Sequence, residues 1–119
     1  MKYLLDGVKK KLNSEEEMLF TISCSLDLKG IRHRLTPGVL ISTNKRLFFY
    51  SRDIMGDEWM QDYFYENLLD VKEQKNLFGV TSILFLYKNE RVAFRNVASG
   101  NPTAIVQKIR GKVIEHSKG

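Results

Sequence analysis

The stretch Gly38-Val-Leu-Ile-Ser-Thr-Asn-Lys-Arg-Leu-Phe-Phe-Tyr50 decides the fold class of this chain. Two runs rich in aliphatic and aromatic residues, 38–43 and 46–51, flank Asn44-Lys45. Such runs favour extended strands, and an asparagine with a flexible neighbour between them is typical of a hairpin. The stretch predicts two antiparallel strands, with Thr43 and Asn44 hydrogen-bonding backbone groups at the turn.

The segment before this hairpin alternates apolar and polar residues from Phe20 to Leu28. A period of two predicts a strand with one buried face. Cys24 lies on the apolar side, so we expect it to be a small core residue. A nucleophilic role is disfavoured because no histidine is near in sequence and burial raises the pKa of a thiol.

The segment after the hairpin contains four further short extended runs. They are 58–65, 68–73, 81–87 and a last run marked by Val92 and Phe94, with turns at 52–57, 66–67, 76–79 and 88–90. Short strands at intervals of roughly 8 to 12 residues favour an antiparallel sandwich or barrel over a parallel α/β sheet. Seven strands are therefore expected in all.

A helix is expected at each end of the chain. Apolar residues spaced by three and four predict that one face of each helix docks on the strands. The N-terminal helix carries Leu4, Leu5, Val8 and Leu12, and the C-terminal helix carries Ile105, Val106, Ile109 and Val113. Asn101 is the expected cap of the second helix and Pro102 its first residue. Glu15-Glu16-Glu17, between the first helix and the first strand, is expected to be a solvated turn.

The hairpin at 38–50 resembles the Thr-Asn-Lys-Arg hairpin of the bacterial pleckstrin-homology-like (PH-like) domains. Residues 64–71, 77–79 and 94–97 are similar to the same family in order and spacing. The resemblance covers approximately residues 17–114. It implies a seven-stranded antiparallel sandwich or partly open barrel capped by a C-terminal helix. Residues 17–119 would form this mainly β (α+β) domain, and residues 1–16 a helical extension.

Composition narrows the class of protein. At 119 residues and 43% hydrophobic content, the chain can bury one core. One cysteine and two histidines cannot form an internal disulfide or supply a structural zinc site, so we expect neither metal nor cofactor. Asp6 interrupts the first apolar run before a signal peptide could form. A cytoplasmic protein is expected, at most peripheral to the inner face of the membrane.

Charge is unevenly distributed along the chain, whose net charge is +5. The charged residues within 29–52 are all basic, whereas those within 53–73 are all acidic apart from Lys72. The hypothetical anion- or lipid-binding residues are Lys29, Arg32, Arg34, Lys45 and Arg46. The first three resemble the pattern with which phosphoinositide-binding PH domains hold phosphates, and arginine forks suit phosphate oxygens. The alternative is solvated loop charge at 29–34 and a structural turn at 43–46.

Function is expected to be noncatalytic binding, with a protein partner or an anionic phospholipid surface as the ligand. No glycine-rich phosphate loop or nucleophile elbow is present, so an enzyme is the least supported class. A single-stranded nucleic-acid site is an alternative, because Phe48, Phe49 and Tyr50 follow two basic residues. Self-association through an edge strand is a further alternative.

Overall fold

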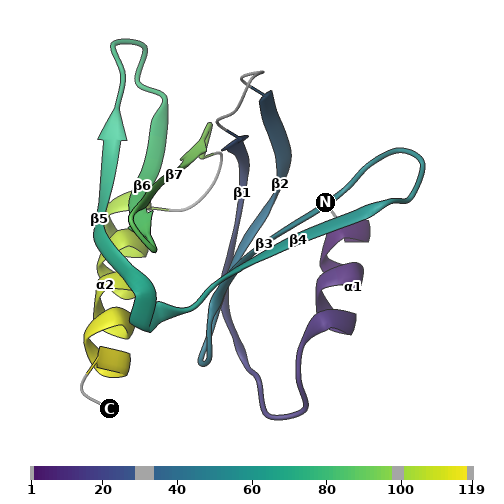
Figure 1. The fold of residues 1–119 in the computed structure, drawn as a ribbon. Helices are drawn as coiled ribbons and strands as arrows, with labels where there is room; N and C mark the ends of the chain where they lie inside the picture. Colours follow the sequence, from purple (N-terminus) through teal and green to yellow (C-terminus); the bar gives the residue numbers. More distant parts are fainter. Residues whose placement is uncertain (1, 29–33, 98–100, 118–119) are drawn as a thin grey trace.

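The computed structural model describes residues 2–28, 34–97 and 101–117 of the chain. A helix stands at each end of seven strands (Figure 1). The elements are α1 (Lys2–Lys11), β1 (Met18–Leu28), β2 (Arg34–Thr43), β3 (Leu47–Arg52), β4 (Glu58–Tyr63), the 3-10 turn η1 (Tyr65–Asn67), β5 (Leu68–Lys75), β6 (Thr81–Tyr87), β7 (Glu90–Arg95) and α2 (Pro102–Ser117). The predicted order of elements is confirmed.

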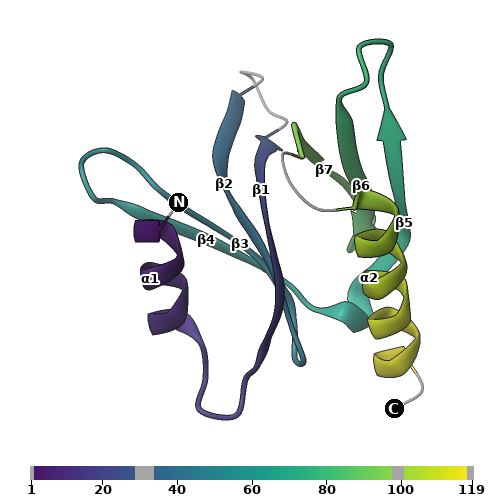
Figure 2. The ribbon, with the colours of Figure 1, turned by 180° about the vertical axis from the view of Figure 1, so that it is seen from behind.

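The strands form one antiparallel sheet in the order β4-β3-β2-β1-β7-β6-β5. It bends between β1 and β7, where the register pairs only Ser25 with Arg95 and Leu26 with Phe94. Figure 2 shows the result, with β1–β4 on one side and β5–β7 with α2 on the other. Among the described residues β4 and β5 are the two edges. The expected seven-stranded antiparallel sandwich is confirmed, and it is open: the sheet does not close into a barrel.

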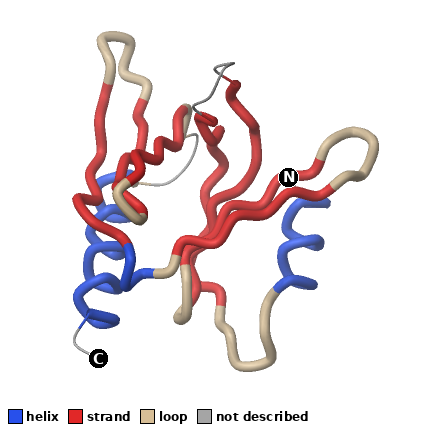
Figure 3. Tube along the Cα trace, viewed as in Figure 1, coloured by secondary structure: helices blue, strands red, loops and turns tan. Residues whose placement is uncertain are grey.

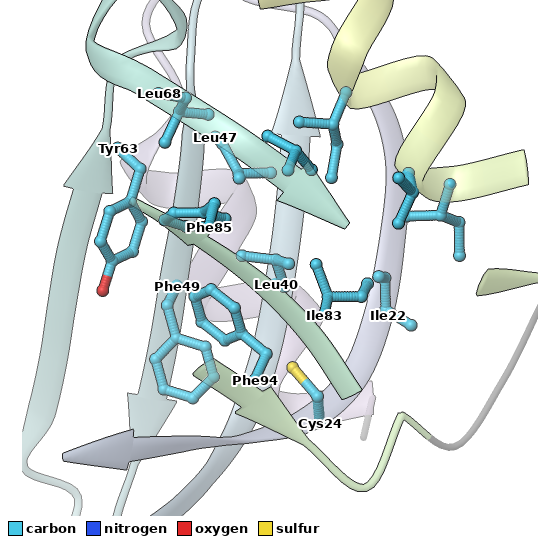
Figure 4. Close-up of a cluster of buried hydrophobic side chains, with 14 of the residues drawn as sticks. Ile22, Cys24, Leu40, Leu47, Phe49, Tyr63, Leu68, Ile83, Phe85 and Phe94 are labelled. Carbon is cyan, nitrogen blue, oxygen red and sulfur yellow. The ribbon is translucent and has the colours of Figure 1, made fainter. Parts of the chain in front are cut away.

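The main core fills the space between the two halves of the sheet and α2. Figure 4 shows its centre, where Phe85 and Phe94 pack with ring centroids 5.6 Å apart. The alternation predicted for β1 places Ile22, Cys24 and Leu26 here, all buried. The stripe of α2 closes the core through Ile105, Val106, Ile109 and Val113. The Asn101 cap is confirmed, since the backbone N–H of Ala104 donates to its Oδ1 at 3.3 Å.

A smaller core lies on the outer face of β2 and β3. Val8 and Leu12 bring α1 against Val39, Ile41, Phe48 and Tyr50. Side chains on both faces are buried at residues 39–41 and 47–50, which explains why these two runs are continuously apolar instead of alternating. The N-terminal helix thus packs on the sheet, as predicted.

Strand boundaries differ from expectation at β2, which begins at Arg34 and not at Gly38. Pro37 lies inside the strand and pairs with Ser25 of β1. Pairing between β2 and β3 begins only at Val39, so at Pro37 the strand β2 is paired with β1 alone. A proline, which has no backbone N–H, is tolerated at such a position because no hydrogen bond to β3 is lost. Of the helices described, neither is long and apolar enough to cross a membrane.

Candidate functional site

Of the five basic residues proposed from sequence, Arg34 does not share one end of the molecule with Lys45 and Arg46. Lys29 and Arg32 lie outside the described residues, and Arg34 is the first residue of β2. Lys45 and Arg46 follow the last residue of that strand (Figure 1). Ten extended residues span about 33 Å, so β2 separates Arg34 from Lys45 and Arg46. Arg34 therefore cannot act together with Lys45 or Arg46 on one small anion.

Arg46 is buried and bound to protein groups. Its Nε and Nη2 donate to the two carboxylate oxygens of Glu16 at 2.9 and 3.0 Å, and its Nη1 donates to Asp62 at 2.7 Å. Nη2 also reaches the carbonyl oxygen of Lys11 at 3.0 Å. The guanidinium lies over the ring of Phe48, 4.6 Å from its centroid. These contacts join α1, β3 and β4, which is a structural role.

Glu16 corrects the expectation of a solvated turn at 15–17. Its carboxylate is buried and accepts hydrogen bonds from Arg46, from the Thr43 hydroxyl at 2.6 Å and from the Asn13 backbone N–H at 3.1 Å. Burial alone would raise the pKa of Glu16, but these hydrogen bonds and the charge of Arg46 outweigh it and lower the pKa. Nothing local in the sequence marks this glutamate, because its partner lies thirty residues away.

In the turn between β2 and β3 the prediction is confirmed for Thr43, whereas the Asn44 side chain bonds the backbone of the segment before β1 and not that of the turn. The Thr43 hydroxyl accepts from the backbone N–H groups of Lys45 and Arg46 at 3.1 and 3.0 Å. Asn44 Oδ1 accepts from the backbone N–H of Glu17 at 2.7 Å. Lys45 itself is exposed. The turn explains Thr43 and Asn44 structurally, and Lys45 contributes an exposed charge at this end of the sheet.

The opposite end of β2 adjoins the other basic group. The register of β1 and β2 reaches the pair Leu28 and Arg34, so the connection between them has only the residues 29–33. Asp27, the nearest acidic residue on β1, is bound to Arg95 Nε at 3.2 Å.

A groove of about 720 Å³ lies along the open side of the sandwich. Trp59 and Tyr63 of β4 form one wall, while Tyr87, Lys88 and Arg91 of the β6–β7 hairpin form the other. Lys88 Nζ lies 5.4 Å from the centroid of the Tyr87 ring. The sequence could not reveal this groove, since its walls are about thirty residues apart and meet only in the folded sheet. The lining combines aromatic rings with two cations, Lys88 and Arg91, and two carboxylates, Asp27 and Glu90, so the groove suits an apolar contact with polar groups of both charges.

The aromatic run in β3 does not offer a surface for bases. Phe48, Phe49 and Tyr50 are each completely buried, in the two cores. Stacking on a nucleobase needs an exposed ring face, so the basis of the nucleic-acid alternative is removed.

Cys24 is confirmed as a core residue. It is buried in the main core together with Phe94, and burial raises the pKa of its thiol to about 12. The His116 ring packs 5.0 Å from that of Tyr65. Over the described residues, no cluster of three or more histidine, cysteine or carboxylate side chains is close enough to hold a metal ion.

Comparison with solved structures supports the fold. The C-terminal domain of an unknown protein from Leishmania infantum is 18% identical with a TM-score of 0.71, covering 92% of this chain and 98% of that one. The Vps36 N-terminal PH domain is 14% identical with a TM-score of 0.70, covering 91% and 86%. The pleckstrin homology domain from Shewanella amazonensis SB2B is 13% identical with a TM-score of 0.60, covering 94% and 96%. No curated protein matches the sequence significantly.

The family model described as "Bacterial PH domain" matches residues 12–111. PH-like domains commonly serve as binding modules and are generally noncatalytic. The match spans most of the chain, including β1 to β7 and the part of α2 up to Gly111. The chain therefore belongs to the bacterial PH domain family.

Proposed function

We propose that this chain is a noncatalytic binding module that docks on an anionic phospholipid surface, at the inner face of the membrane. The contact is the connection from β1 to β2, with Lys29, Arg32 and Arg34 as the binding residues. One observation carries the proposal: β1 and β2 stay paired up to Leu28 and Arg34, so all three cations fall within one short connection and the residue that ends it.

The sequence of this connection supports an anionic ligand, because residues 28–34 hold three basic side chains and no acidic one. Arginine presents two parallel N–H donors to phosphate oxygens, whereas lysine adds a compact positive charge. Several cations near one surface attract anionic lipids, and the attraction falls with ionic strength.

Lys45 and Arg46 are not part of the proposed contact. The guanidinium N–H groups of Arg46 donate hydrogen bonds to Glu16, to Asp62 and to the carbonyl oxygen of Lys11. Lys45 lies beyond the other end of β2, so its substitution serves as the control for the loss of a positive charge outside the proposed contact.

The test is binding of the purified protein to vesicles of phosphatidylcholine containing phosphatidylglycerol, at low salt. We expect Arg32→Ala/Arg34→Ala to weaken binding by about tenfold or more, because each basic residue near the surface contributes about 1 kcal/mol. Lys45→Ala removes one charge at the other end of β2 and should weaken binding by less than about twofold. Equal losses in the two variants would show that net charge alone, and not this connection, determines binding.

A protein partner is the second candidate, favoured by the groove between β4 and the β6–β7 hairpin. Its aromatic walls would supply salt-resistant apolar contact. Binding of this kind would be lost on Trp59→Ala and unchanged in Arg32→Ala/Arg34→Ala.

A further inference from the structure

The tip of the β5–β6 hairpin is a rigid turn built on Asn76. Its Oδ1 accepts from the backbone N–H groups of Phe78 and Val80 at 2.8 and 3.0 Å. The Gly79 N–H donates to the Asn76 carbonyl at 3.0 Å, and Gly79 has φ of 79°, which glycine adopts without strain. The side chain of Asn76 thus fixes the backbone of the tip.

The tip of the β3–β4 hairpin has the same construction on Asp53. Its Oδ1 accepts from the backbone N–H groups of Met55 and Asp57, both at 2.9 Å. Gly56 donates to the Asp53 carbonyl at 3.0 Å and has φ of 87°. The two tips are therefore a matched pair in backbone structure.

Each tip presents two large apolar side chains to solvent. Leu77 and Ile54 are fully exposed, Phe78 is 90% exposed and Met55 is 83% exposed. The hydrogen bonds within each turn fix the backbone from which these side chains project. Four such residues held outward contrast with the buried core, and exposed apolar clusters mark interaction sites.

Charge distinguishes the two tips. From Gln74 to Ser82 the β5–β6 hairpin has Lys75 and no acidic residue, and Val80 adds a partly exposed apolar side chain. From 52 to 58 the β3–β4 hairpin has three acidic residues and one arginine. An anionic surface would attract the first tip and repel the second.

The β5–β6 tip lies on the same side of the molecule as the last residues of β1 and the first residues of β2. In Figure 1 and Figure 3 this hairpin and the adjoining ends of β1 and β2 all point upward, while the last turn of α2 points downward. Figure 2 shows the same arrangement from behind. A surface that contacts the β1–β2 end can therefore also contact Leu77 and Phe78.

We propose that the β5–β6 tip inserts Leu77 and Phe78 into the apolar layer of an anionic phospholipid bilayer. This inference rests on the proposed function and deepens it, since the β1–β2 connection would supply electrostatic attraction and the tip an apolar anchor. Membrane affinity scales with buried apolar area in addition to electrostatic attraction, so the two contributions are separable by salt.

The first test compares two matched variants on phosphatidylglycerol/phosphatidylcholine vesicles. Leu77→Ser/Phe78→Ser should weaken binding by about tenfold or more. The reason is that the favourable free energy of transferring two large apolar side chains from water into the bilayer is lost. Ile54→Ser/Met55→Ser changes the same turn in an acidic setting and should weaken binding by less than about twofold. Both sites are outside the cores, so thermal unfolding should be unchanged and serves as the folding control.

The second test detects insertion of the β5–β6 tip into the bilayer directly. An environment-sensitive fluorophore on Leu77→Cys should shift to shorter wavelength and be quenched by spin-labelled lipid, whereas the same label on Ile54→Cys should respond little. Cys24 does not interfere, because it is buried and the pKa of its thiol is raised to about 12.

The outcomes separate this inference from the function on which it rests. Binding lost in Arg32→Ala/Arg34→Ala but unchanged in Leu77→Ser/Phe78→Ser, with no response at position 77, would overturn the anchor and leave the lipid contact standing. Equal losses in the two tip variants would also overturn it. Absence of binding by the unmodified protein at low salt would overturn both proposals.

Discussion

The carboxylate of Glu16 accepts two hydrogen bonds from the guanidinium of Arg46, Nε to Oε2 at 2.9 Å and Nη2 to Oε1 at 3.0 Å. This pair joins the segment before β1 to the turn between β2 and β3. Asp62 on β4 binds the same guanidinium at 2.7 Å. The Lys-Arg sequence of the hairpin is thus explained by two different roles, an exposed lysine and a buried arginine.

Arg46→Met should destabilise the fold strongly. The substitution leaves Glu16 buried without its cation, and breaking a buried pair from one side costs about 3 to 5 kcal/mol. Urea unfolding measures the change. Lys45→Ala, one residue away and exposed, should alter the free energy of unfolding by less than about 0.5 kcal/mol. A loss for Arg46→Met no larger than that control would contradict the structural role of the pair.

The contribution of Glu16 to stability should depend on pH. Its pKa in the folded state is below the ordinary value of 4.5, so its contribution is complete above about that pH and is lost as the pH falls through the folded-state pKa. Glu16→Gln removes the titration. The free energy of unfolding of the unmodified protein should exceed that of Glu16→Gln at pH 7, and the difference should shrink below pH 4.5. A difference independent of pH would refute the ion pair.

Two helical glycines should respond in opposite directions to alanine. At Gly111 an added Cβ would meet no atom within 4 Å, so Gly111→Ala should stabilise the protein by about 0.5 to 1 kcal/mol. At Gly7 the Cβ would lie 2.7 Å from Tyr50 Cζ, where α1 packs on β3. Gly7→Ala should destabilise the protein by about 1 to 3 kcal/mol. Thermal unfolding measures both, and stabilisation in both would mean that α1 is not docked as described.

Cys24 should react only when the sheet opens. Its thiol is buried and its pKa is raised to about 12, so the thiolate is scarce at neutral pH. Labelling with a disulfide reagent should be slow in buffer and fast in denaturant. Rapid labelling of the native protein would place Cys24 outside the main core.

Local patterns sufficed for most of the fold. The alternation from Phe20 to Leu28 predicted β1, and the Lys88-Asn89 turn was found where expected, with φ of 52° and 70°. These signals lie within a few residues of one another, so they can be interpreted without knowledge of tertiary contacts. The β2 start at Arg34 was missed because Pro37 is acceptable only where one side of the strand has no partner.

The site was less predictable, because its features depend on distant residues. The sequence analysis placed Lys45 and Arg46 in one candidate site with Arg34 because all three are basic. The length of β2 shows that Arg34 lies at one end of this strand and that Lys45 and Arg46 lie beyond the other. The burial of Glu16 and the groove beside Trp59 arise from contacts across the sheet. The repeat of an Asn or Asp followed three residues later by glycine, at 53–56 and 76–79, was a signal for the matched tips.

The most direct test of the account is the affinity of the unmodified protein for vesicles as phosphatidylglycerol content and salt are varied. We predict that affinity rises with the anionic fraction and falls as salt increases, with little binding to pure phosphatidylcholine. Equal affinity for neutral and anionic vesicles, or no binding at low salt, would contradict the proposal that this PH domain docks on an anionic lipid surface.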